Sequence, residues 1–294
     1  MNYFFKAATI AAIITAGQGV SAIELPDQIG DHAVLQQQSD AKLWGWAKPG
    51  AKVTVTPSWS KKAVTTTADK TGRWSLRVAP PAASYEPYSI TFAEGNDKLT
   101  INDILIGEVW LAAGQSNMEM PMRGFNSQPV EGAAADIARS GKLRDRVRMA
   151  YLVRGDEYEP QERIAGKWKV ASPENTPEFS AQGFYFAREL NDLIDVPVGI
   201  LCASYGGTQV EGWLPRDILD KYGYGAEADV PEPMRLAYRY TTKYNSMIHP
   251  LIGYTIKGFI WNQGESNAGN PPTYAKLLTD MVARWRSDWG DTEN

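Results

Sequence analysis

Ser116 follows an apolar run that ends at a glycine, in the sequence Gly114-Gln115-Ser116-Asn117. A serine between a buried strand and a helix lies close to unpaired backbone N–H groups, which favour an oxyanion. The same arrangement also suits an ordinary helix N-cap. Because the turn is not the Gly-x-Ser-x-Gly elbow, it identifies Ser116 only as a candidate nucleophile.

Two more apolar runs end in polar turns that contain glycine, at Gly206-Gly207-Thr208 and Asn262-Gln263-Gly264-Glu265. The carboxyl ends of parallel strands face one crevice, so turns from three strands can converge there. Acyl transfer would use such a convergence, because the oxyanion formed when a serine attacks a carbonyl needs preorganised donors. We interpret the N–H groups of Ser116 and Gly206 and the Gln263 amide as candidate donors.

The elements that position these turns alternate between strands and helices. Apolar runs predict buried strands, and helical spacing predicts helices between them. The predicted strands are 104–113, 147–153, 198–203 and 256–261, and the predicted helices are 131–140, 180–193, 241–248 and 274–289. Residues 103–294 are therefore expected to form a three-layer α/β domain with a parallel sheet, in which 156–177 is a long loop.

Residues 23–102 have a different pattern, in which short runs alternate apolar and polar residues between turn sequences such as Pro49-Gly50. This pattern predicts a small all-β sandwich domain. Its expected strands are 42–46, 52–56, 62–67, 73–78 and 88–92. The domain either supports its neighbour or binds carbohydrate through Trp44, Trp46 or Trp59, since buried and sugar-binding tryptophans give the same pattern.

The first 22 residues resemble an export signal, with Lys6 as the only charge, an apolar core over 7–16 and Val20-Ser21-Ala22 for cleavage. The apolar core is shorter than the roughly 20 residues of a membrane span. We expect a secreted or periplasmic protein with no membrane span. Oligomeric state is not readable from the sequence.

The charge and cysteine content exclude several classes of partner and site. A formal net charge of −4 gives no indication of a nucleic-acid partner or an anionic membrane surface. The single cysteine, Cys202, excludes an internal disulfide, and its apolar surroundings predict a buried, inert thiol. The sequence also lacks the spacing of histidines or carboxylates that is typical of a metal site.

Four motifs occur in a family-specific order. They are Gly-Gln-Ser-Asn-Met at 114–118, Gly-Gly-Thr at 206–208 with Trp213 soon after, Asn-Ser-Met-Ile-His-Pro-Leu at 245–251, and Trp-Asn-Gln-Gly-Glu-Ser-Asn at 261–267. Together they resemble the sialate O-acetylesterase family of the SGNH hydrolase superfamily.

The resemblance implies an SGNH-like fold behind a β domain, a serine esterase that removes acetyl groups from sugars, and no cofactor. It implies Ser116 as the nucleophile, Gly206 or Gly207 as the second oxyanion donor, and Gln263 where many SGNH enzymes carry asparagine. An O-acetylated sugar or glycan is the implied substrate. The alternatives are a non-catalytic carbohydrate-binding protein and an acetylxylan-type deacetylase.

One feature departs from the family pattern, in which an Asp-x-x-His arrangement follows the Gln-Gly-Glu turn. The only histidines here are His32 and His249, and neither has an aspartate three residues before it. We therefore expect a chain truncated before its acid/base residues, without the roughly 10²- to 10⁴-fold contribution of a general base. His249 is left with three possible roles, as a base, as a structural residue or as a residue that lines the site.

Three carboxylates, Glu119, Glu211 and Glu265, lie near the three turns in the sequence. Two facing carboxylates would suit a glycosidase. We expect hydrogen bonding within the turns or at a helix N-terminus instead.

Overall fold

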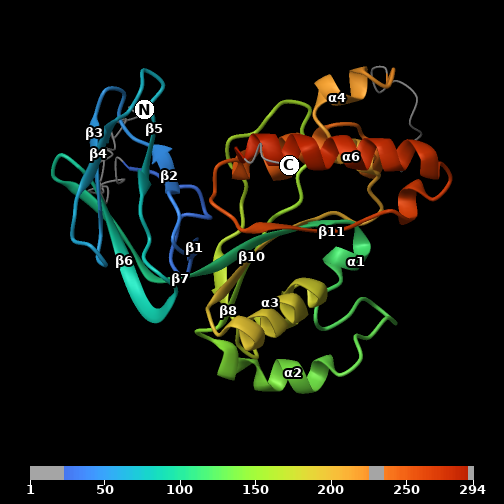
Figure 1. Ribbon diagram of the computed structural model, residues 1–294, viewed down its shortest axis with the longest axis horizontal. Coiled ribbons are helices and arrows are strands. Elements are labelled where there is room, and N and C mark those ends of the chain that lie inside the picture. Colours follow the sequence, from blue (N-terminus) through green and yellow to red (C-terminus); the bar gives the residue numbers. More distant parts are fainter. Residues whose placement is uncertain (1–22, 225–234, 291–294) are drawn as a thin grey trace, which may run out of the picture.

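The computed structural model describes residues 23–224 and 235–290 of the 294-residue chain. The expected export segment, 1–22, lies outside the described residues. In the remainder an all-β part and an α/β part lie side by side (Figure 1).

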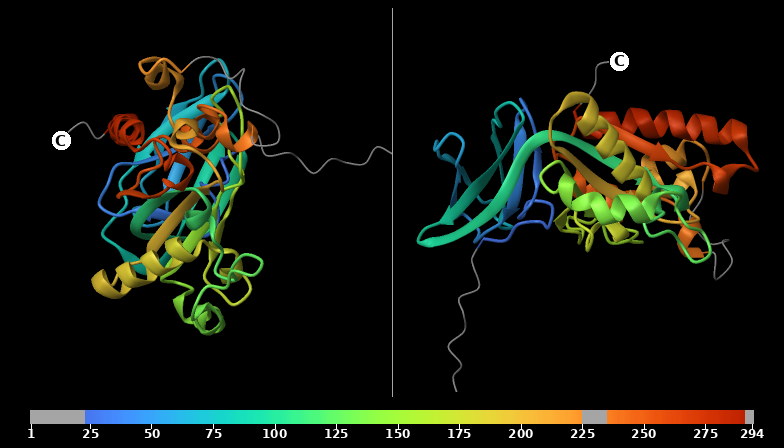
Figure 2. Two further views of the ribbon diagram at one scale, coloured as in Figure 1. Left: turned by 90° about the vertical axis from the view of Figure 1, so that its right-hand side faces the viewer. Right: turned by 90° about the horizontal axis from the view of Figure 1, so that it is seen from below.

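One long strand, β7 (Asp97–Gly114), runs through both parts of the molecule, as the curved ribbon in Figure 2 shows. Its first half pairs antiparallel with β6 (Ser84–Glu94). Its second half lies between two parallel neighbours, β10 (Val198–Ser204) and β11 (Gly258–Asn262). The boundary predicted between residues 102 and 103 therefore lies inside a continuous strand.

The α/β part has the strand order β11-β7-β10-β8-β9, in which β8 (Val147–Tyr151) is parallel to β10 and β9 (Trp168–Val170) is antiparallel to β8. Every residue of β10 is buried, as its continuous apolar run predicts. Helix α6 (Pro271–Asp288) covers one face of the sheet and α3 (Ala181–Ile194) the other (Figure 1). The predicted three-layer α/β class is confirmed.

The all-β part consists of short antiparallel strands. The first half of β7 continues through β6 to β3 (Lys52–Pro57) and β4 (Val64–Thr67). A separate pair, β2 (Ala41–Trp46) and β5 (Arg73–Val78), lies against them, with the rings of Trp74 and Phe92 5.8 Å apart in the core.

The sequence pattern missed two strands of three residues each. β1 (Val34–Gln36) pairs parallel with β7, and β9 lies in the segment predicted as a loop. Three residues are too few to establish an alternation, so only the pairing reveals these strands.

The remaining elements are short. The helices are α1 (Ser116–Glu119), α2 (Ala133–Arg139), α4 (Arg216–Asp220) and α5 (Arg235–Tyr238), and helical turns occupy Ser140–Leu143, Thr176–Glu178, Val210–Trp213, Tyr244–Ile248, His249–Leu251 and Glu265–Asn267. Within 23–224 and 235–290, no helix has both the length and the apolar character to cross a membrane.

Candidate active site

The three predicted turns begin at the same level of the sheet. Ser204 at the end of β10 and Asn262 at the end of β11 both pair with Gly114 on the central strand. Tyr205 N–H also donates to the Gly114 carbonyl oxygen, at 3.0 Å. The register therefore brings the turns of Ser116, Gly206 and Gln263 to one edge of the sheet, as the convergence of parallel strands predicts.

Gly114 allows the chain to turn into α1. A Cβ at this position would overlap the Asn262 carbonyl group, so only glycine permits the close approach of β7 and β11. Ser116 is the first residue of α1 and is half-buried. Its N–H has no intrahelical partner, as for the first residues of any helix, and its hydroxyl bonds to no residue that the structure describes.

The Gly206 turn packs against the start of α1 through Glu119. Gly206 N–H donates to the Glu119 carboxylate, with 2.6 Å between N and Oε2. A Cβ on Gly206 would lie 2.9 Å from that oxygen and 3.6 Å from the Ser116 Cβ. Glu119 is only 6% exposed and forms an ion pair with Arg154, which is half-exposed.

The Gln263 side chain donates hydrogen bonds to neighbouring protein groups. Its amide nitrogen donates to the Thr208 carbonyl oxygen at 2.9 Å and to Asn267 Oδ1 at 2.8 Å. Asn267 in turn donates to Glu211, at 2.8 Å. Because both amide hydrogens have acceptors, Gln263 joins the second and third turns in this structure and has no free N–H for an oxyanion.

Two further side chains connect the first turn to the third. Gln115 Oε1 accepts the N–H groups of Gly264 and Ser266, at 3.4 and 3.3 Å. Asn117 donates to Glu265, with 2.5 Å between Nδ2 and Oε1. Glu119, Glu211 and Glu265 all accept hydrogen bonds within or between the turns, as predicted.

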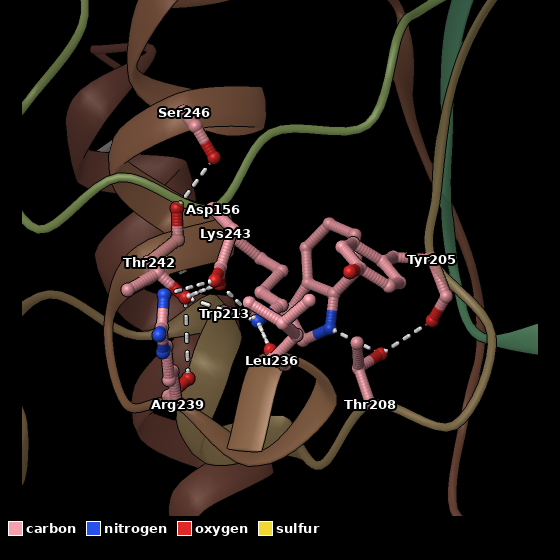
Figure 3. Close-up of polar contacts among 9 residues, drawn as sticks. All are labelled: Asp156, Tyr205, Thr208, Trp213, Leu236, Arg239, Thr242, Lys243 and Ser246. Carbon is pink, nitrogen blue, oxygen red and sulfur yellow. Dashed lines mark hydrogen bonds and ion pairs between the residues drawn. The ribbon is translucent and has the colours of Figure 1, made fainter. Parts of the chain in front are cut away.

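A charge cluster that is mostly buried lies beside the second turn (Figure 3). Asp156 pairs with Lys243 at 2.6 Å and with Arg239 at 2.7 Å, and Lys243 is fully buried. The Lys243 ammonium lies 4.9 Å from the centre of the Tyr205 ring, the residue before Gly206. Thr208 Oγ1 donates to the Tyr205 carbonyl oxygen and accepts from Trp213, which fixes the turn from the other side.

Sequence reasoning identified the turns but missed these supports. Arg154, Asp156 and Lys243 belong to no recognisable motif, and they meet the turn only through the fold. Nothing in the sequence around Asp156 or Lys243 indicates that they pair, because most charged residues are solvated at the surface.

Neither histidine contacts Ser116 within the described part of the chain. His32 Nδ1 lies 2.6 Å from Asp103 Oδ2, and His249 Nδ1 lies 2.7 Å from the Gln161 carbonyl oxygen. His249 lines a cavity beside β2 that includes none of the three predicted site residues. No group of three or more His, Cys, Asp or Glu side chains in 23–224 or 235–290 is placed to hold a metal ion.

Comparison with known proteins gives the family. Residues 106–293 match the family model of the carbohydrate esterases described as sialic acid-specific acetylesterases. This chain belongs to that family. The match covers all three turns, from the strand before Ser116 to the helix after Gln263.

The relatives of this acetylesterase-family chain are longer than the chain itself. Sialate O-acetylesterases from Pongo abelii and Homo sapiens are 30% and 29% identical to it, over 88% of this chain and 52% of each relative. The crystal structure of a carbohydrate acetylesterase from Xanthomonas citri superposes with a TM-score of 0.81 at 33% identity, covering 92% of this chain and 58% of that one. The chain thus spans about half the length of the curated relatives it matches.

Proposed function

We propose that this chain provides the nucleophile and the oxyanion-binding groups of a serine O-acetylesterase that acts on acetylated sugars such as sialic acids. Ser116 Oγ attacks the acetyl carbonyl carbon while a general base takes its proton, and that proton passes to the sugar oxygen as the tetrahedral intermediate collapses. Water then hydrolyses the acetyl-serine and releases acetate. The shared level of the three turns supports this proposal, because it brings the donors and the nucleophile to one edge of the sheet.

The bond between Gly206 and Glu119 is the observation that carries the assignment of the second donor. The Glu119 oxygen, 2.6 Å from Gly206 N, is a carboxylate oxygen beside the nucleophile turn. This Glu119 oxygen occupies the place of the anionic oxygen of the intermediate, which needs the same donor. When the intermediate forms, its anionic oxygen replaces Glu119 as the acceptor of the Gly206 N–H, and Arg154 continues to balance the Glu119 charge.

Gln263 enters the proposal as a positioning residue in this conformation. Its bonds to Thr208 and Asn267 hold the second turn at a fixed distance from the third. Rotation of the amide upon substrate binding would be needed before Gln263 could donate to the oxyanion directly. Export to the periplasm or beyond and the division into a β domain and an esterase domain are further parts of the proposal.

A chemical-rescue experiment tests the proposal. Acetate release from O-acetylated sialic acid, acetylated xylan and 4-nitrophenyl acetate is measured with and without imidazole, a general base in solution. We expect slow release that imidazole accelerates in the native chain and not in Ser116→Ala. If acetate release in every condition is the same for both proteins, the serine mechanism is wrong, and the preferred substrate distinguishes sialate from acetylxylan specificity.

One observation favours the second candidate, a carbohydrate-binding protein without turnover. In the described residues the Ser116 hydroxyl has no basic partner, and both histidines bond elsewhere. Measurable affinity for acetylated sugars with no acetate release in imidazole would support this alternative. The affinity should then be unchanged in Ser116→Ala.

A further inference from the structure

A cavity of about 450 Å³ lies between the β2–β5 strand pair and the His249–Ile252 segment of the α/β part. Its lining includes none of Ser116, Gly206 and Gln263. Figure 1 shows β2 on the side of the all-β part that faces the α/β part. The volume lies in the range of small-molecule sites in proteins, and it accommodates one or two sugar rings.

Aromatic and small side chains form one wall of this cavity. Alternation along β2 leaves Trp44 and Trp46 half-buried on the same face. The antiparallel register places Trp44 opposite Ser75 and Trp46 opposite Arg73. Because Ser75 is short, it leaves space beside the Trp44 ring, which Tyr254 holds edge to face at 6.3 Å between ring centres.

The indole groups of this wall have unused hydrogen-bond donors. Six of the ten tryptophans in the chain donate to a protein oxygen. Trp44 and Trp46, which line the cavity, donate to no described residue. Both side chains are only half-buried, so their N–H groups can donate to a ligand that brings oxygen acceptors.

The rest of the lining is polar and balanced in charge. Thr66, Thr67 and Ser75 also line it, and the hydroxyls of these residues bond to none of the described residues. Lys42 and Arg73 contribute two positive charges, and Asp69 and Glu162 two negative ones. Arg73 and Glu162 form an ion pair across the two parts of the molecule. Balanced charge disfavours an anionic ligand and favours a neutral one rich in hydroxyls.

We propose that this cavity is a second carbohydrate site, which binds a neutral sugar unit of a glycan chain against Trp44. The Arg163 guanidinium lies 3.5 Å from the centre of the Trp46 ring and covers one of its faces. The Lys42 ammonium lies farther from the Trp44 ring, 5.6 Å from its centre, on a flexible side chain. Trp44 is therefore the stacking surface, and Trp46 contributes its N–H group. A chain held here keeps further sugar units at high effective concentration near the esterase part.

Titration calorimetry with neutral oligosaccharides tests this site independently of hydrolysis. The titrations use Ser116→Ala protein with xylohexaose, cellohexaose and mannohexaose, and N-acetylneuraminic acid as the anionic comparison. Trp44→Ala removes the stacking surface, and Ser75→Lys fills the space beside it and unbalances the charge. Trp59→Ala is the matched control, because Trp59 is also in the all-β part but packs on Tyr88 and donates to the Ala79 carbonyl oxygen.

We expect at least one neutral oligosaccharide to bind, with affinity about tenfold or more weaker in Trp44→Ala and Ser75→Lys. Trp59→Ala should bind as tightly as the parent protein. Thermal unfolding of each variant establishes that it is folded. The proposal is wrong if none of the neutral sugars binds, if both cavity variants bind normally, or if N-acetylneuraminic acid binds more tightly than all of them. The imidazole experiment tests the esterase proposal separately.

Discussion

Gly206→Ala is predicted to displace the Glu119 carboxylate. The new methyl group would lie 2.9 Å from Glu119 Oε2, which is closer than carbon and oxygen approach without bonding. Gly206 has no positive φ, so the backbone itself accepts alanine. The carboxylate must therefore withdraw, and its bond with the Gly206 N–H is lost.

Two opposing contributions set the change in the free energy of unfolding that Gly206→Ala causes. A hydrogen bond to a charged group contributes about 1.5–3 kcal/mol to stability, and the lower end applies because the displaced Glu119 can keep its ion pair with Arg154. Replacing glycine by alanine stabilises by about 0.4–1 kcal/mol through the unfolded chain. The free energy of unfolding should fall by about 1 kcal/mol.

Urea unfolding of a double-mutant cycle checks this value. In a Glu119→Ala background no carboxylate remains to be displaced, so Gly206→Ala should become neutral or stabilising. Equal destabilisation in both backgrounds would refute the contact as the cause. Gly207→Ala is the control, since its φ of +76° costs about 1–2 kcal/mol of backbone strain in either background.

Gly206→Ala also tests how Glu119 and the oxyanion share the Gly206 N–H. Alanine keeps its backbone N–H, so this variant retains the donor and removes the competing carboxylate. We expect Ser116-dependent acetate release in imidazole to be maintained or raised in Gly206→Ala. A fall of about 10²- to 10³-fold, the usual effect of losing one oxyanion donor, would contradict this reasoning.

Three further predictions concern groups around the site and in the sheet. Burial raises the pKa of Asp103, but hydrogen bonds from Arg148 and His32 outweigh it and leave the pKa below its usual value; the unfolded chain then binds more protons, so stability should fall as the pH drops below about 4. The urea midpoint should change less between pH 3 and 6 in Asp103→Asn than in the parent protein. An equal pH dependence of the midpoint in both proteins would contradict this. Burial raises the pKa of the Cys202 thiol to about 11, so dithionitrobenzoate at pH 8 should label it only after unfolding; rapid labelling of the native protein would show that it is accessible. Gln263→Met should lower the free energy of unfolding by about 1–3 kcal/mol, because acceptors on Thr208 and Asn267 lose their donor; unchanged stability would exclude the positioning role.

Much of the framework is readable from local pattern. The continuous apolar run at 198–203 predicted β10, and the helical spacing at 180–193 predicted α3, because burial on one or both faces imposes its own period on the sequence. The glycine-containing turns after three such strands indicated one converging edge. The paired register of Gly114 with Ser204 and Asn262 agrees with that prediction.

Other features depend on contacts between residues far apart in the chain. The all-β and α/β parts share β7. Local composition does not reveal this, because β7 keeps its extended conformation throughout and only its neighbouring strand changes, from β6 in the all-β part to β10 in the α/β part. The short strands β1 and β9 are likewise defined by pairing alone.

The opening motif identified Ser116 as a candidate, and the order of the motifs indicated the family. Local pattern was thus enough to predict which residue types lie at the edge of the sheet and in what order. The acceptors of their hydrogen bonds are known only from the folded chain, in which Gly206 donates to Glu119, and Gln263 donates to Thr208 and Asn267. The N–H groups of a turn bond to whichever acceptor the packing of distant segments brings within about 3 Å, and no local pattern specifies that acceptor.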